Sequence, residues 1–183
     1  MDERGERGEG GGGGGGGEKV ERVDERDRVV AVVGRAEAVR RGWPHRIAVT
    51  VCRDREGRIL VQRRAGHLDR FPGHYEAMSG GAVAVGETYG EAAARELVEE
   101  LGVRAPVRFV VKFLSRGGLS PHWLAVHEAV LSEAPDPDPD EVAWHGWLSE
   151  SELLRAVRED PFTPDTREAL GRYFAAVDRA GRT

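Results

Sequence analysis

Acidic side chains gather in one short stretch of this chain, and their spacing suits metal chemistry. Residues 81–103 read GAVAVGETYGEAAARELVEELGV. On an α-helix with 3.6 residues per turn, Glu96, Glu99 and Glu100 fall within an arc of about 100°. Three carboxylates on one helix face repel each other, so they raise one another's pKa or require a cation. Their hard oxygen atoms suit Mg²⁺ or Mn²⁺ better than zinc.

The residues around these carboxylates favour a positioned helix over the alternative, a solvated acidic surface. Thr88 and Glu91 form the T-x-x-E pattern of a capping box, which places the helix start near residue 88. Gly102 is a residue type that ends helices. Gly80 and Gly81 precede the helix, and glycine lets bare backbone approach a ligand. The sequence therefore predicts a glycine-led loop followed by a capped helix with one carboxylate face.

The spacing G-x5-E-x7-R-E-L-x-E-E-x-G-V resembles the signature of the Nudix hydrolase family. Nine fixed positions match within 23 residues, namely Gly81, Glu87, Arg95, Glu96, Leu97, Glu99, Glu100, Gly102 and Val103. A looser likeness covers about residues 28–175. The resemblance implies an α/β fold, an α/β/α sandwich with a mixed β-sheet. It also implies cleavage of a diphosphate linkage with a divalent metal.

The resemblance assigns the metal to a defined set of groups. Mg²⁺ (or Mn²⁺) would be held by the carboxylates of Glu96, Glu99 and Glu100 and the backbone carbonyl of Gly81. Glu87 would complete this set through water. Together these residues form the expected metal site.

The same resemblance assigns catalytic roles. Arg95 would orient the helix glutamates, and it has carboxylates four residues before and after it, within pairing reach. In this family, an acidic residue outside the signature often acts as general base, and Glu141 and Glu76 are the candidates. The expected catalytic residues are therefore Glu96, Glu99, Arg95 and Glu141.

Arginines near the ends of two expected strands are candidates for binding substrate phosphates, because a guanidinium group can donate two parallel hydrogen bonds to phosphate oxygens. They are Arg46, Arg63 and Arg64. Side chains alternate along a strand, so Arg63 and Arg64 face opposite sides and at most one points into a given cleft. Solvation at the surface is the alternative for each.

Four short motifs resemble the isomerase-like branch of the family: HR at 45–46, QRRA at 62–65, FPG at 71–73 and FTPD at 162–165. In isopentenyl-diphosphate isomerases of that branch, the histidine of HR binds metal. Here a hydrogen-bonded histidine at a strand start is the preferred interpretation of His45. Thr163 or Asp165 of FTPD is interpreted as capping the last helix.

Those isomerases carry a catalytic cysteine in an N-T-C-x-S-H-P segment after FPG. The corresponding residues 76–81 read EAMSGG and contain neither cysteine nor histidine. Cys52 lies in an apolar run and is expected to be a buried structural thiol. The favoured function is hydrolysis of an acid anhydride, in a nucleoside diphosphate linked to another moiety or in a related diphosphate. The alternatives are an isomerase-like enzyme and a diphosphate-binding module without turnover.

Composition excludes several other classes. The 183 residues carry a net charge of −5, which disfavours nonspecific nucleic-acid binding. One cysteine excludes an internal disulfide and favours a reducing compartment. Neither a membrane-spanning run nor a signal peptide is apparent, so a cytoplasmic location is expected. The expected partner is a small-molecule diphosphate substrate, without nucleic acid or membrane, and homodimerisation is left open.

The chain divides into a tail and one domain. Residues 1–26 contain the glycine run Gly10–Gly17 and are expected to form a disordered, charged tail. Residues 27–183 form the expected Nudix domain. Strands are expected at 29–33, 47–52, 58–62, 107–114, 123–131 and 142–148, with a hairpin turn at 54–57. Helices are expected at 36–41, from about 88 to 101, at 149–159 and at 166–180.

Overall fold

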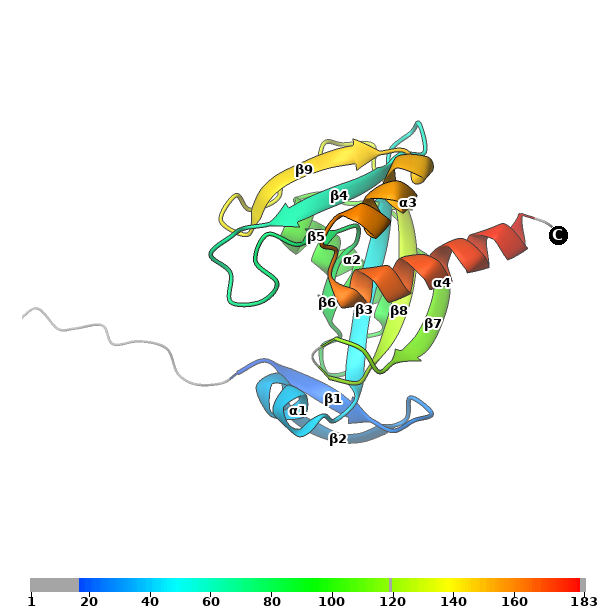
Figure 1. The fold of residues 1–183 in the computed structure, drawn as a ribbon. Coiled ribbons are helices and arrows are strands. Elements are labelled where there is room, and N and C mark those ends of the chain that lie inside the picture. Colours follow the sequence, from blue (N-terminus) through cyan, green and yellow to red (C-terminus); the bar gives the residue numbers. More distant parts are fainter. Residues whose placement is uncertain (1–16, 119, 182–183) are drawn as a thin grey trace, which may run out of the picture.

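The fold is described from a computed structural model, which covers residues 17–118 and 120–181 (Figure 1). The strands in these residues are β1 (Lys19–Val23), β2 (Val29–Gly34), β3 (His45–Arg53), β4 (Ile59–Arg64), β5 (Tyr75–Glu76), β6 (Ser79–Ala82), β7 (Arg108–Ser115), β8 (His122–Val130) and β9 (Val142–Leu148). The helices are α1 (Arg35–Arg41), α2 (Tyr89–Leu101), α3 (Glu150–Glu159) and α4 (Pro164–Ala180).

A mixed sheet forms the centre of the molecule. Its main strands run in the order β5-β4-β3-β8-β7, with β6 paired to β3 and β9 paired to β4. β3 and β8 are parallel, whereas the other pairs are antiparallel. β3 pairs with β4, β6 and β8 and is therefore the central strand of the sheet.

Helices cover both faces of this sheet. Successive side chains of a strand point to opposite faces, so β3 and β4 supply two separate cores. On one face they pack with α3 and α4, burying Val51, Val61, Leu153, Leu170 and Tyr173. On the other they pack with α2, burying Cys52, Leu60, Leu97 and Leu101. Figure 1 shows α4 crossing one face and α2 lying behind the other. The predicted α/β/α sandwich with a mixed sheet is confirmed.

The central hairpin opens after its turn. β3 and β4 are joined as predicted, and Arg53 is paired with Ile59 beside the turn. Farther along, β3 pairs with β6 instead, from Ile47 opposite Ala82 to Thr50 opposite Ser79. β4 meanwhile pairs with β5 and β9. This divergence leaves an opening in the sheet, bordered by β3, β4 and β6.

Both predicted ends of α2 are confirmed. The Thr88 side chain accepts a hydrogen bond from the Glu91 backbone N–H, and the Glu91 carboxylate accepts one from the Thr88 N–H. Gly102 has a φ of 66° in the left-handed region and ends the helix. These two signals fix where the helix starts and stops, and so which of its residues face the opening in the sheet.

The predicted boundary between tail and domain at residue 26 is wrong. β1 lies within the predicted tail and pairs with β2, and its Val20 and Val23 are 0% and 1% exposed. Val20 packs against Ala38 of α1 and Ala82 of β6. The folded unit therefore includes residues 19–26. The prediction for residues 1–16 lies outside the described residues.

Smaller differences concern element ends. α4 begins at Pro164, two residues before the predicted start, with Thr163 at the N-cap position. Thr163 makes no side-chain capping bond, and its hydroxyl donates instead to the Thr166 hydroxyl at 2.9 Å. The loop that follows β4 ends in β5. No helix in the described parts of the chain is long and apolar enough to cross a membrane.

Candidate active site

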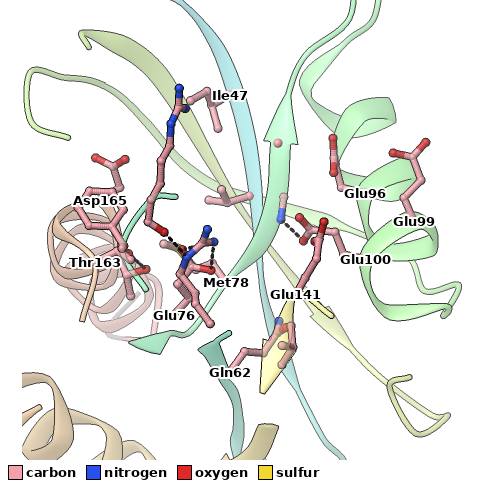
Figure 2. Close-up of a pocket in the computed structure, with 18 of the residues that line it drawn as sticks. Ile47, Gln62, Glu76, Met78, Glu96, Glu99, Glu100, Glu141, Thr163 and Asp165 are labelled. Atoms are coloured by element: carbon pink, nitrogen blue, oxygen red, sulfur yellow. Dashed lines mark hydrogen bonds and ion pairs between the residues drawn. The ribbon is translucent and has the colours of Figure 1, made fainter. Parts of the chain in front are cut away.

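A cavity of about 520 Å³ occupies the opening between the diverging strands. One wall is α2, which contributes Glu96, Glu99 and Glu100. The opposite wall is the start of α4, which contributes Thr163 and Asp165. Figure 2 shows these two walls facing each other, with β6 between them. The helix carboxylates that the sequence singled out thus line one cavity.

The two glycines of β6 bring bare backbone against these carboxylates. A Cβ on Gly81 would lie 2.5 Å from Oε1 of Glu96, so the carboxylate occupies the space that any other residue would fill. The Gly80 backbone N–H donates to Oε2 of Glu100 at 2.8 Å. Glycine at both positions lets α2 pack close to the sheet edge, with its carboxylates against the backbone.

Two of the carboxylates on this wall are desolvated by burial. Glu96 is only 9% exposed, and burial raises the pKa of its carboxyl, although Arg95 opposes the rise. Burial and the neighbouring Glu96 raise the pKa of Glu100 to about 7. Two half-desolvated acids side by side are stable as anions only if a cation joins them.

Arg95 is the cation that already touches this wall. Its guanidinium donates to Oε1 of Glu96 at 2.8 Å and to Oε2 of Glu99 at 2.9 Å. It also donates to both Glu87 oxygens, at 2.9 and 3.0 Å, and to the Ala82 carbonyl at 3.0 Å. Arg95 therefore holds the two helix glutamates in place, which is the orienting role that the resemblance implied.

Glu87 has a different place from the one expected. Besides pairing with Arg95, its carboxylate accepts a hydrogen bond from the Ala84 backbone N–H at 2.9 Å. It is not among the residues that line the cavity. That Glu87 completes the metal site through water stays a prediction; in this conformation its side chain pairs with Arg95.

The remaining donors fit a divalent cation by their chemistry. They are hard carboxylate oxygens on one helix face, beside the backbone of Gly81, and burial raises the pKa of two of the carboxyls, those of Glu96 and Glu100. In this conformation, residues 17–118 and 120–181 assemble no group of three or more His, Cys, Asp or Glu side chains around a common point. The Arg95 guanidinium donates hydrogen bonds to Glu96 and Glu99, and the Gly80 backbone N–H donates one to Glu100. Metal binding would therefore require these carboxylates to rotate toward a common point.

Of the three predicted substrate arginines, one lines the cavity. Arg64 does so, and its Nη1 lies 3.3 Å from Oε2 of Glu76. Arg63 is exposed on the opposite side of β4 and is not a lining residue, as alternation along the strand predicted.

The prediction for Arg46 is not supported. Its guanidinium pairs with Glu21 at 2.8 Å and Asp27 at 2.7 Å, and it too is not a lining residue. This side chain joins β3 to the hairpin of β1 and β2, whose first strand lies within the predicted tail. The pairing of β1 with β2 was not predicted, so these acidic partners of Arg46 could not be recognised from the sequence.

Both candidates for the general base line the cavity. Glu141 is exposed just before β9, and Figure 2 shows it between the α2 carboxylates and Gln62. Glu76 lies toward the other wall, and burial raises the pKa of its carboxyl although Arg64 opposes the rise. In the described residues the Glu141 carboxylate has no ionic partner, whereas that of Glu76 is paired.

Other lining residues were not singled out from the sequence as site residues. Arg70, in the loop between β4 and β5, lines the cavity, as do His122 of β8 and Asp165 of α4. Arg70 makes no side-chain ion pair with any described residue, so its charge is available to an anion. The run LDRFPG offered a signal for Arg70, since a basic residue next to a Pro-Gly turn is held on a loop. His122 and Asp165 had no local signal.

The two residues that link the chain to isomerase chemistry are both buried elsewhere. Cys52 is 2% exposed on the α2 face of the sheet, and burial raises the pKa of its thiol to about 12. His45 is 2% exposed, and its Nδ1 lies 3.5 Å from the Trp43 carbonyl. Neither is a lining residue of the cavity. The expectation of a buried structural thiol is confirmed.

Comparison with known proteins agrees with this geometry. The family model for the NUDIX domain matches residues 43–170. An uncharacterized Nudix hydrolase from Streptomyces coelicolor is 42% identical over 154 residues, which cover 82% of this chain and 85% of that protein. A protein named isopentenyl-diphosphate Delta-isomerase from Nocardia farcinica is 37% identical over 168 residues, covering 86% and 96%.

A solved structure shares the fold closely. The crystal structure of a Deinococcus radiodurans protein matches with a TM-score of 0.74 and 29% sequence identity, covering 86% of this chain and 99% of that one. The chain therefore belongs to the Nudix hydrolase family. The resemblance carried by residues 81–103 is confirmed, and with it the Nudix-type fold.

Proposed function

We propose that this protein is a divalent-metal-dependent hydrolase that cleaves the diphosphate linkage of a nucleoside diphosphate joined to another moiety, or of a related diphosphate. The observation that carries the proposal is the α2 wall of the cavity. There Glu96, Glu99 and Glu100 face one space beside the bare backbone of Gly81. Mg²⁺ bound at this wall would neutralise charge on the diphosphate oxygens.

The chain's own groups divide the remaining work. Arg64 and Arg70 line the same cavity and can bind non-bridging phosphate oxygens. Arg95 keeps Glu96 and Glu99 oriented. Glu141, unpaired among the described residues, is placed to accept a proton from the attacking water. A carboxylate within reach of solvent suits that task.

Isomerisation of isopentenyl diphosphate is the second candidate, because the Nocardia farcinica relative carries that name. Protonation of an alkene carbon requires a strong acid placed beside it. The thiol of Cys52 is buried on the α2 face, away from the cavity lining. Glu76 is the acid that the corresponding segment offers, and it is held by Arg64. These contacts favour hydrolysis.

A substrate panel separates the two. The purified protein is incubated with Mg²⁺ and a set of nucleoside diphosphate conjugates, dinucleoside diphosphates and isopentenyl diphosphate, and the products are separated by anion-exchange chromatography. We expect cleavage of at least one diphosphate linkage and no dimethylallyl diphosphate. Glu133→Gln, at an exposed glutamate outside the cavity, should cleave like wild type. Formation of dimethylallyl diphosphate, lost in Glu76→Gln, would overturn the proposal in favour of isomerisation.

A further inference from the structure

The α4 wall of the cavity contains buried polar atoms that nothing in the protein satisfies. Four buried side-chain atoms of the described residues have no hydrogen-bond partner: Thr50 Oγ1, His122 Nε2, His127 Nδ1 and Asp165 Oδ1. Two of these residues, His122 and Asp165, line the cavity, and Thr50 and His127 do not. Burial of a polar atom without a partner is unfavourable, so such atoms inside a cavity mark where a ligand group completes the structure.

The hydrogen bond at Nδ1 of His122 sets the tautomer of its ring. His122 is the first residue of β8 and is 2% exposed. Its Nδ1 lies 2.8 Å from the backbone carbonyl oxygen of Ser120. A carbonyl oxygen can only accept, so Nδ1 carries the hydrogen of the neutral imidazole. Nε2 then carries the lone pair and is an acceptor.

Asp165 supplies a second acceptor next to it. The residue lies in the first turn of α4, and the backbone of Gly118 packs so closely that a Cβ there would be 2.4 Å from Oδ1. Burial raises the pKa of the Asp165 carboxyl, and the neighbouring His122 opposes that rise. The nearby hydroxyl of Thr163 donates to Thr166, so this donor is already used within the wall.

Two acceptors without donors define the chemistry of what binds. A diphosphate has no hydrogens to offer at neutral pH, and an alkyl or prenyl chain has neither donors nor acceptors. A hydroxyl group has one hydrogen and satisfies one of the two atoms, whereas an amino group or two neighbouring hydroxyls satisfy both. We propose that His122 and Asp165 form an acceptor pair that binds neighbouring hydroxyls or an amino group on the moiety beyond the diphosphate. The enzyme then prefers polyhydroxylated substituents, such as sugars, over hydrocarbon ones.

This inference rests on the proposed function only for its orientation: the diphosphate lies toward α2, Arg64 and Arg70, and the donor-bearing group lies toward α4. The test uses two symmetric probes of equal chain length, P1,P2-diglyceryl diphosphate and P1,P2-dipropyl diphosphate. Because both ends of each probe are the same, the direction of binding does not matter. The probes differ by their hydroxyl groups.

We expect wild type with Mg²⁺ to cleave the diglyceryl compound with a kcat/KM at least about tenfold above that of the dipropyl compound, since each satisfied buried acceptor contributes about that factor. Asp165→Asn replaces one acceptor oxygen by a donor at equal volume and should bring the ratio toward one. Asp160→Asn, at an exposed aspartate outside this cavity, is the matched control and should keep the wild-type ratio. Melting temperatures verify that the variants fold, and His122→Gln replaces Asp165→Asn if the latter does not.

Equal cleavage of both probes by wild type, or an unchanged ratio in Asp165→Asn, would overturn the acceptor pair while leaving hydrolysis intact. If neither probe is cleaved, the proposed hydrolysis of such compounds fails, and calorimetric binding of the same two probes decides the acceptor pair. A tenfold tighter Kd for the diglyceryl probe that is lost in Asp165→Asn supports it, and equal Kd values contradict it.

Discussion

The two walls of the cavity differ in how the chain assembles them. On the α2 wall, Glu96, Glu99 and Glu100 lie within five residues of one another, and helical periodicity alone puts them on one face. On the α4 wall, His122 and Asp165 come from a strand and a helix far apart in the sequence. Functional side chains that are close in the sequence can be predicted from their spacing. Functional side chains that only the tertiary fold brings together are found from the structure.

The largest expected effect comes from removing charge on the α2 wall. In the double variant Glu99→Gln and Glu100→Gln, turnover of any substrate found in the panel should fall by about a hundredfold or more, because two anionic ligands are lost. The melting temperature should hold, since glutamine keeps the volume and the oxygen that accepts from Gly80. Turnover close to that of wild type, at full metal saturation, would show that the chemistry takes place elsewhere.

The adjacent glycines of β6 have different roles, because Gly80 serves the fold and Gly81 the site. A Cβ on Gly80 would lie 2.1 Å from the Ala48 carbonyl oxygen, which is backbone and cannot move away. On Gly81 it would meet the Glu96 carboxylate, which can rotate. Gly80→Ala should therefore lower the melting temperature by roughly 10 °C or more.

Gly81→Ala should keep the melting temperature and lower kcat/KM by about ten- to a hundredfold, the usual cost of displacing a group that positions a ligand. Differential scanning calorimetry and steady-state kinetics on both variants check the pair. An inactive but stable Gly80→Ala, or an unstable Gly81→Ala, would reverse the assignment.

The features that the sequence predicted correctly are the local ones, and those that it missed depend on tertiary contacts. The ends of α2, its carboxylate face and the six longer strands β2, β3, β4, β7, β8 and β9 were predicted correctly, because caps and periodicity act within a few residues. The short strands β5 and β6 were not predicted. β1 was missed, since its two buried valines stand among charged residues, and Val20 finds its partners in α1 and β6. Arg46 was misplaced for the same reason: its partners Glu21 and Asp27 belong to that unrecognised hairpin.

Truncation tests the corrected boundary. Removing residues 1–26 deletes β1, and the burial of Val20 and Val23 alone contributes about 3 kcal/mol or more. The melting temperature should then fall by roughly 6–12 °C. Removing residues 1–16 keeps β1 and should leave the melting temperature nearly unchanged. If both truncations melt alike, β1 does not contribute to stability.

The smallest effect concerns pH and the contacts of Asp27. Burial alone would raise the pKa of this carboxyl, but hydrogen bonds from Lys112 and Arg46 lower it below its usual 3.8. A carboxyl with a depressed pKa in the folded state adds stability above its unfolded pKa and loses it as the pH falls through the folded value. The wild-type melting temperature should therefore drop more steeply below about pH 4 than that of Asp27→Asn. Parallel curves would show that the Asp27 contacts add nothing.

Isothermal titration calorimetry with Mg²⁺ measures whether the α2 wall binds metal. Mg²⁺ is titrated into the full chain, into the double variant Glu99→Gln and Glu100→Gln, and into the surface control Glu133→Gln. We predict measurable binding to the wild type and to the control, and its loss in the double variant. Equal Mg²⁺ affinity in the double variant and the wild type would contradict the account.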